Sequence, residues 1–237
     1  MNKRSMLLVA GALAALAFTA LPGAASAKET ALKCETSGAN CTFTTTGGVT
    51  TFSSTSGDTL SCTSVTGSGG VLNPVNNEAT TITVSLKFHG CKETTTGFNF
   101  ACTSPGQPSG TIVPTPNTIG HIVALPGTAT ENGVLFTDIK TTFTCAGGFA
   151  RSTITGNVIG ENEAKCGTAA STIQKLNFDA PTHGSQKITT WTGKTFNMLY
   201  MTNHPETPTV GGTYEAMAQK STGVLTWSNP VTVTCAE

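Results

Sequence analysis

Apolar and polar residues alternate along the segment from Ala79 to Cys91. Ile82, Val84, Leu86 and Phe88 fall at every second position, and threonine, serine or lysine stands between them. A period of two in a run rich in β-branched residues predicts a strand with one buried and one solvated face. Similar short alternating runs, separated by glycine- and proline-rich turns, continue through most of the chain. The strand pattern of this segment is therefore typical of the protein.

The runs recur at regular spacing and predict the fold class. They cover residues 41–44, 49–52, 59–66, 79–91, 98–102, 111–113, 121–125, 134–145, 149–159, 171–178, 188–201, 224–227 and 231–235. We therefore predict an all-β protein, an antiparallel β-sandwich or barrel-like fold of roughly a dozen short strands, stapled by disulfides. Residues 214–220 are the exception, because their composition favours a short helix.

The N-terminal residues differ from the rest of the chain. Asn2-Lys3-Arg4 supplies positive charge, the residues from Met6 to Leu21 are nearly all apolar, and Ala25-Ser26-Ala27 forms a small-x-small cleavage site. This pattern predicts a secretory signal peptide over residues 1–27 and a single secreted β domain over residues 28–237. A membrane anchor fits less well, because it needs about 20 apolar residues and has no cleavage site. We expect a secreted, extracellular or cell-surface protein with no membrane span after cleavage.

Eight cysteines in an exported chain indicate disulfides. Four share the apolar parity of their strands and should point inward: Cys62, Cys102, Cys145 and Cys235. The other four lie in polar turns: Cys34, Cys41, Cys91 and Cys166. Among the 105 possible pairings, we predict Cys34–Cys41, Cys62–Cys235, Cys91–Cys102 and Cys145–Cys166. A metal site is the alternative, but there is no C-x-x-C pair or histidine at ligand spacing, so we expect no metal and no cofactor.

The charge content limits the classes of partner. Charged residues make up only 11% of the chain and the formal net charge is zero, whereas about 25% is usual in soluble domains. The chain contains neither a basic stripe for nucleic acid nor a polybasic patch for anionic lipid. Short neutral side chains keep the outer strand faces hydrated instead. The remaining partners that we consider are a cell-envelope polymer and another surface protein.

Several turn and cysteine motifs resemble those of one group of proteins. They are Ser61-Cys62-Thr63 with Thr66-Gly67-Ser68-Gly69, Phe88-His89-Gly90-Cys91, Ala101-Cys102-Thr103-Ser104-Pro105-Gly106 with Gly110-Thr111-Ile112, Phe143-Thr144-Cys145 and Thr155-Gly156-Asn157-Val158-Ile159-Gly160. The group is an uncharacterised family of small exported Thr/Gly-rich, cysteine-containing β proteins of Gram-positive soil bacteria. The chain is more weakly similar to exported proteins described as activators of alkane oxidation. The shared motifs are turn and cysteine motifs, so the resemblance implies a scaffold and carries over no catalytic residue.

The sequence offers little for catalysis. The four histidines do not pair at the spacing of a metalloprotease. The Gly67-Ser68-Gly69-Gly70 turn resembles a protease serine loop, but no histidine precedes Ser68, as trypsin-like proteases require. A carboxylate pair for glycoside hydrolysis stays open, and its candidates are Asp58, Glu78, Glu93, Asp138, Asp179 and Glu206. We predict that the protein is not an enzyme.

Four aromatic residues in the last third of the chain are candidates for ligand binding: Trp191, Tyr200, Tyr214 and Trp227. Tryptophan and tyrosine are enriched in binding surfaces, although packing in the core is the alternative that we favour. Three functional hypotheses follow. The first is a non-catalytic structural or surface-interaction protein of the cell envelope or extracellular space. The second is a binding module for a glycan or a small apolar ligand, and the third is a carboxylate-based hydrolase.

Overall fold

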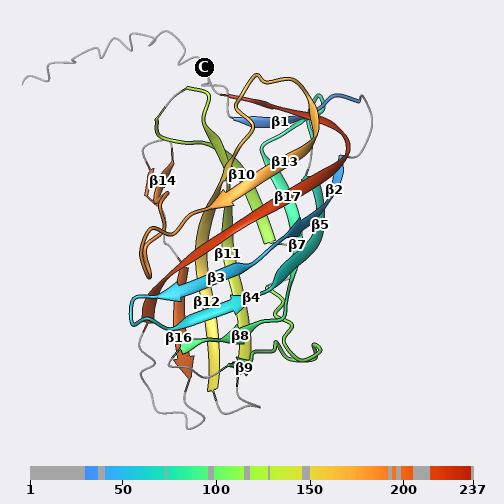
Figure 1. Ribbon diagram of the computed structural model, residues 1–237. Helices are drawn as coiled ribbons and strands as arrows, with labels where there is room; N and C mark the ends of the chain where they lie inside the picture. Colours follow the sequence, from blue (N-terminus) through green and yellow to red (C-terminus); the bar gives the residue numbers. More distant parts are fainter. Residues whose placement is uncertain are drawn as a thin grey trace, which may run out of the picture.

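The computed structural model describes residues 30–36, 41–72, 74–95, 99–114, 118–127, 129–145, 150–191, 194–195, 199–204 and 214–235. These residues form an all-β fold in which fifteen strands belong to one antiparallel sheet and two more form a separate pair (Figure 1). The all-β prediction is therefore confirmed. The predicted signal peptide lies outside the described residues. Within the described part, no helix is long and apolar enough to cross a membrane.

The strands of the main sheet are β1 (Ala31–Cys34), β2 (Thr42–Gly47), β3 (Thr50–Ser54), β4 (Thr59–Cys62), β5 (Ser64–Leu72), β6 (Glu78–Ala79), β7 (Thr81–His89), β8 (Lys92–Glu93), β9 (Phe100–Ala101), β10 (Thr118–Ala124), β11 (Asn132–Cys145), β12 (Ala150–Asn162), β13 (Ser171–Phe178), β16 (Leu199–His204) and β17 (Tyr214–Thr234). The separate pair is β14 (Thr190–Trp191) with β15 (Lys194–Thr195).

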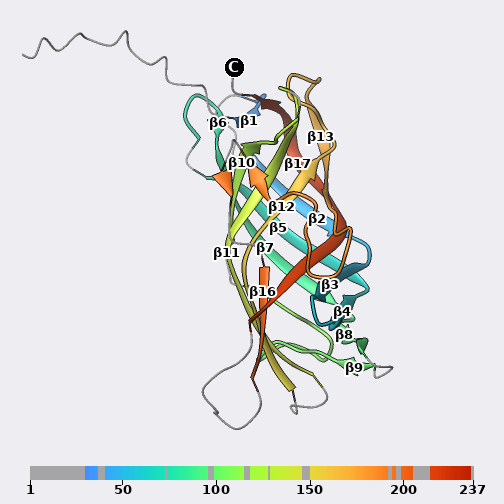
Figure 2. The ribbon, with the colours of Figure 1, turned by 90° about the vertical axis from the view of Figure 1, so that its left-hand side faces the viewer.

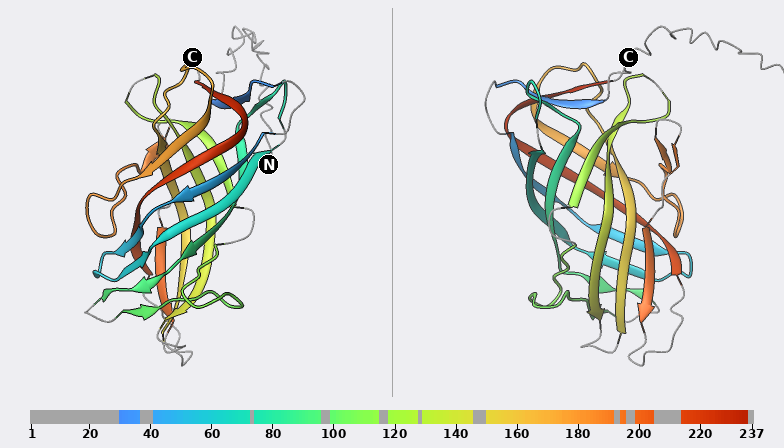
Figure 3. Two further views of the ribbon diagram at one scale, coloured as in Figure 1. Left: turned by 45° about the vertical axis from the view of Figure 1, so that its right-hand side comes forward. Right: turned by 180° about the vertical axis from the view of Figure 1, so that it is seen from behind.

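Eight of the strands form a closed circuit. Their order is β13-β12-β11-β10-β7-β5-β2-β17, and β17 pairs again with β13. Thr226 of β17 shows the closure, because it stands opposite Thr44 of β2 on one side and Ile173 of β13 on the other. Figure 3 shows the tilted strands wrapping around a common interior. Of the two predicted architectures, the fold is therefore the barrel-like one.

The first part of β17 pairs with a different set of strands. Met217 stands opposite Ser54 of β3 and opposite Leu199 of β16. Figure 2 shows β16 next to this part of β17, with which it pairs antiparallel. The predicted helix over residues 214–220 is therefore wrong. Local composition favoured a helix, but partner strands on both sides supply hydrogen bonds that a propensity cannot anticipate.

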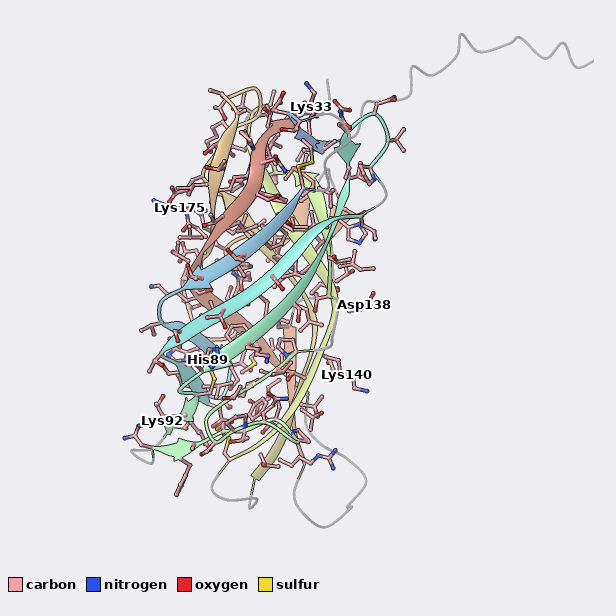
Figure 4. All side chains as sticks on the ribbon, turned by 90° about the vertical axis from the view of Figure 1, so that its right-hand side faces the viewer. Lys33, His89, Lys92, Asp138, Lys140 and Lys175 are labelled. Atoms are coloured by element: carbon pink, nitrogen blue, oxygen red, sulfur yellow. A yellow bond between two sulfur atoms is a disulfide. The ribbon has the colours of Figure 1, made fainter. Side chains whose placement is uncertain are left out.

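The alternation along β7 is confirmed. Ile82, Val84 and Phe88 are almost fully buried, whereas Ser85 and Lys87 are exposed. Figure 4 shows the labelled lysines, Lys92, Lys140 and Lys175 among them, at the outside of the molecule. The buried faces of the strands thus form one main core inside the closed sheet.

A β-bulge in β11 changes which residues face this interior. The register with β12 shifts between Phe136 and Ile139, and Asp138 adopts a positive φ of 54°. The Asp138 backbone N–H donates to Asn157 Oδ1 at 2.9 Å, which holds the bulge. One extra residue in a strand reverses its parity. The inward positions therefore run through Phe136 and then continue at Ile139.

All eight cysteines form disulfides, as predicted, but only one predicted pair is correct. That pair is Cys34–Cys41. The predicted pairs Cys62–Cys235, Cys91–Cys102 and Cys145–Cys166 are wrong. The observed disulfides are Cys62–Cys91, Cys102–Cys145 and Cys166–Cys235.

Backbone contacts between distant segments explain the observed pairs. Thr63 N donates to His89 O at 2.9 Å, which places Cys62 near Cys91. The bridge between Thr103 and Thr144 aligns Cys102 with Cys145, and Gly167 N donates to Val233 O beside Cys166 and Cys235. The register of strands far apart in the sequence therefore decides the pairing.

Candidate functional site

The closed sheet contains a cavity of about 90 Å³. Phenylalanines from five strands contribute to its wall: Phe43 of β2, Phe52 of β3, Phe88 of β7, Phe136 of β11 and Phe178 of β13. Val84 and Leu225 add aliphatic surface. Of the described residues that line the cavity, none has an ionisable side chain. The space is therefore apolar and carries no formal charge.

Three large apolar side chains face this cavity without being fully covered. Leu86, Ile139 and Phe178 belong to the lining and pack against the main core, yet each is only half-buried. An apolar side chain beside empty space lacks partner atoms on that side and loses the dispersion contacts it would otherwise make. The cavity lining thus offers apolar surface that a ligand could cover.

Aromatic pairs pack at two places in the wall. The ring of Phe43 lies against that of Trp227 with 4.7 Å between centroids. Phe43 stands opposite Gly69 of β5, where an added Cβ would come within 2.4 Å of the Phe43 ring. Phe52 and Phe88 meet edge to face at 5.5 Å, a preferred geometry for aromatic pairs. These contacts give the aromatic side of the cavity a defined shape.

The few polar groups of the cavity include a cluster on β2 and β17. Gln219 Nε2 donates to Ser221 Oγ at 2.9 Å, and Thr45 of β2 lies in the same lining. Gly223, between Ser221 and Leu225 on the inward face of β17, also belongs to it. The site therefore combines an apolar interior with a short stripe of neutral polar groups.

The side chain of Gln186 completes the wall beside this polar stripe. β13 and β16 both lie between β12 and β17, at different positions along them. Gln186 lies near this junction, where its Oε1 accepts from Gln219 N at 2.9 Å and its Nε2 donates to Gln219 O at 3.1 Å. Its Nε2 also donates to Asp179 O at 2.9 Å. The amide thus supplies the hydrogen bonds that a neighbouring strand would supply.

No protein-family model, curated protein or solved structure matches the chain. The resemblance to exported Thr/Gly-rich proteins therefore stays a prediction. The functional argument depends on the cavity and on the chemistry of its wall.

Of the four predicted aromatic residues, Trp227 is the one whose side chain the structure describes. Trp227 is buried, and its Nε1 donates to Gln174 Oε1 at 3.3 Å. Trp191 lies on the separate β14–β15 pair, whereas Tyr200 and Tyr214 lie on β16 and β17. The side chains of these three residues are outside the described part of the structure. Trp227 contributes to the core, and a ligand-binding role for the group stays a prediction.

His89 and His121 are partly exposed and hydrogen-bond with threonines of neighbouring strands. His89 Nε2 is 2.9 Å from Thr66 Oγ1, and Figure 4 places His89 on β7. His121 Nε2 is 3.5 Å from Thr137 Oγ1. In the part of the chain that the structure describes, no group of three histidine, cysteine or acidic side chains could hold a metal ion.

Two of the six candidate acids lie near each other. Burial, and then the negative charge of nearby Asp58, raises the pKa of the Glu93 carboxyl above its ordinary value. Ser56 Oγ lies 3.2 Å from Asp58 Oδ2 and 2.5 Å from Glu215 Oε2, and its single hydroxyl hydrogen can donate to one of these carboxylates at a time. None of these acids lines the cavity.

The other acids lie elsewhere. Glu78 belongs to β6, Asp138 forms the bulge and Asp179 follows β13. Glu206 is outside the described residues. Sequence reasoning missed the cavity itself, because its wall combines residues from strands across the whole chain. The available signal was glycine at inward positions of otherwise alternating strands, as at Gly223.

Proposed function

We propose that this protein is a non-catalytic binding protein that takes up a small apolar ligand inside the closed sheet. The observation that carries the proposal is the apolar cavity of about 90 Å³ with no ionisable residue in its described lining. An unfilled cavity costs roughly 24 cal/mol per Å³, so this one corresponds to about 2 kcal/mol of lost packing. A ligand that fills the space recovers this energy.

The size of the cavity limits the ligand. An apolar cavity of about 150 Å³ binds benzene or xenon, and pockets for drug-sized ligands measure roughly 300–1,000 Å³. The lining follows β7 from Val84 to Phe88, which is about 13 Å at 3.3 Å per residue. A small and slim molecule fits these dimensions better than a fused-ring compound.

The four disulfides are consistent with an oxidising environment. Together with the predicted signal peptide, they support a site of action outside the cell or at its surface. There, a carrier or sensor of an apolar molecule would shield its ligand from water. This localisation is part of the proposal.

Uptake of benzene or hexane by the disulfide-intact protein tests the proposal. Binding should raise the thermal unfolding midpoint with ligand concentration, because only the folded state holds the ligand. The variant Gly223→Leu should abolish this shift by filling the cavity, since an added Cβ there meets only Thr45 Oγ1, at 3.8 Å. Gly48→Leu is the matched control, because Gly48 is exposed and no atom lies within 4 Å of an added Cβ. The absence of a shift in the wild type would refute the proposal.

The outer face of the sheet favours a second candidate function, interaction with a cell-envelope polymer. Thr226, Thr44, Ser68 and Ser85 stand side by side on β17, β2, β5 and β7. All four are exposed, and a shallow groove runs beside them. Neutral hydroxyl groups at strand spacing can exchange hydrogen bonds with a sugar polymer.

Co-sedimentation with insoluble cell-wall polysaccharide tests this second function. The double variant Thr44→Lys/Ser68→Lys should release the protein from the polymer, because long side chains would cover the hydroxyl row. Thr172→Lys, on the exposed part of β13, should not. Equal retention of both variants would contradict this interaction surface.

A further inference from the structure

The polar stripe inside the cavity contains a hydroxyl group with spare hydrogen-bonding capacity. Thr45 is 7% exposed and belongs to the cavity lining. Among the described residues, no hydrogen-bond partner is found for its Oγ1, yet this atom is not fully enclosed, in contrast to Thr50 Oγ1. Because Thr45 faces inward, the remaining accessible surface of its hydroxyl lies toward the cavity.

Gly223 leaves the space in front of this hydroxyl open. Thr45 of β2 stands opposite Leu225 of β17. Leu225 and Gly223 are successive inward-facing residues of β17. A Cβ added to Gly223 would lie 3.8 Å from Thr45 Oγ1 and near no other atom. Any larger residue at this position would cover the hydroxyl. The glycine therefore gives a ligand group access to Thr45.

Ser221 adds a second polar group on the same wall. Its Oγ accepts the hydrogen bond from Gln219 Nε2, which leaves the hydroxyl hydrogen of Ser221 to donate. A ligand hydroxyl or carbonyl oxygen in front of Gly223 can thus accept from Thr45 or Ser221. We call Thr45, Ser221 and Gly223 the polar niche.

The niche suits a neutral group and excludes an ionised one. The described lining contains no lysine, arginine or histidine that could pair with a carboxylate, and no acid that could pair with an amine. A charge buried without a partner is strongly disfavoured, whereas a neutral group needs only one or two hydrogen bonds. The wall therefore discriminates between ligands of equal length by the charge of their polar end.

We infer that the ligand is an uncharged apolar molecule with a single hydroxyl or carbonyl group, and that the polar niche binds this group. The inference rests on the proposed uptake of an apolar ligand and specifies its chemical class. The hydrocarbon part covers the surfaces of Leu86 and Phe178, and the polar group points to β2 and β17. A fatty acid carboxylate of the same length is rejected.

A matched series of six-carbon probes tests the inference: hexane, 1-hexanol and hexanoate. The dissociation constants of the full, disulfide-intact chain are measured at pH 7 by competition with an apolar fluorescent probe. 1-Hexanol should bind about tenfold more tightly than hexane, as one hydrogen bond allows. Hexanoate should bind at least about tenfold more weakly than 1-hexanol, and this difference should shrink near pH 4, where a carboxyl group becomes protonated.

The variant Thr45→Val removes the hydroxyl while keeping the shape of the side chain. It should lower the affinity for 1-hexanol toward that for hexane and leave the affinity for hexane unchanged. Thr46→Val is the control, because Thr46 is the next residue of β2 and its side chain is exposed on the outer face. This control should preserve the preference for the alcohol.

The outcomes separate this inference from the function on which it rests. If none of the three probes binds, the proposed uptake of apolar ligands is refuted as well. If hexane binds but 1-hexanol has no advantage, or hexanoate binds as tightly at pH 7, apolar binding stands and the polar niche is refuted. An alcohol preference that survives Thr45→Val would also contradict the role of this residue.

Discussion

The disulfide Cys166–Cys235 should contribute more to stability than Cys34–Cys41, although it is the less buried of the two. Cys166 lies in the turn between β12 and β13, and Cys235 directly follows β17. Their sequence separation is 69 residues, against 7 for Cys34 and Cys41. No other disulfide begins or ends between residues 166 and 235. The longer loop is therefore independent of the other three.

Two physical effects predict opposite rankings. In the chain-entropy account, a cross-link restricts the unfolded state more as its loop grows, which corresponds to roughly 4 kcal/mol for 69 residues and roughly 2 kcal/mol for 7. Packing predicts the reverse, because Cys34 and Cys41 are almost fully buried, whereas Cys166 and Cys235 are partly exposed. The difference of about 2 kcal/mol from chain entropy should exceed the packing difference.

Urea unfolding at 25 °C under non-reducing conditions measures the ranking. The variants are Cys166→Ala/Cys235→Ala and Cys34→Ala/Cys41→Ala, each compared with the wild type. The first should lose about 4 kcal/mol and the second about 2 kcal/mol. The slope m should increase in both variants, because the unfolded chain becomes less compact. An equal or larger loss in the Cys34–Cys41 variant would refute the entropic ranking and assign the stabilisation to native packing.

Further substitutions test individual contacts. Gly69→Ala should destabilise the protein by several kcal/mol, because an added Cβ would lie 2.1 Å from a carbonyl oxygen of β7, whereas Gly48→Ala should be neutral or slightly stabilising in the same urea titration. Trp227→Phe should cost about 1–3 kcal/mol, since it leaves Gln174 Oε1 buried without its donor; a cost near zero in chemical unfolding would show that the hydrogen bond is unimportant. Glu93→Gln should stabilise the protein at pH 7 but not near pH 4. The pKa of Glu93 is raised in the folded state, so folding favours the protonated carboxyl and wild-type stability falls as the pH rises. Glutamine carries no charge at either pH and avoids this loss. The same gain at both pH values would exclude the ionisation of Glu93 as its cause.

The strands could be predicted from the sequence because their signal is local. The alternation in β7 needs only the neighbours of each residue, and the structure places Ile82 and Phe88 inside as expected. The helix predicted over residues 214–220 was wrong because a local signal was not enough there. The partner strands β3 and β16, which make this segment a strand, lie elsewhere in the chain.

The disulfide pairing could not be predicted in the same way. Three of the four predicted pairs joined cysteines that are close in the sequence, and of these only Cys34–Cys41 is correct. Cys102 instead meets Cys145 through a backbone bridge between Thr103 and Thr144. Which strands are neighbours depends on the free energy of the whole closed sheet. A one-residue change of register would turn an inward cysteine to the opposite face of the sheet.

The candidate site depends on the sizes of inward side chains from many strands, and the inward glycines show how the space arises. At Gly67, a Cβ would lie 2.9 Å from the side chains of Leu86 and Thr45, and at Gly69 it would meet the Phe43 ring. Neighbours have therefore filled the room that these two glycines leave. At Gly223 only Thr45 Oγ1 lies within reach, at 3.8 Å. The missing side chain at residue 223 therefore keeps this part of the cavity open. One substitution at Gly223 should therefore close it.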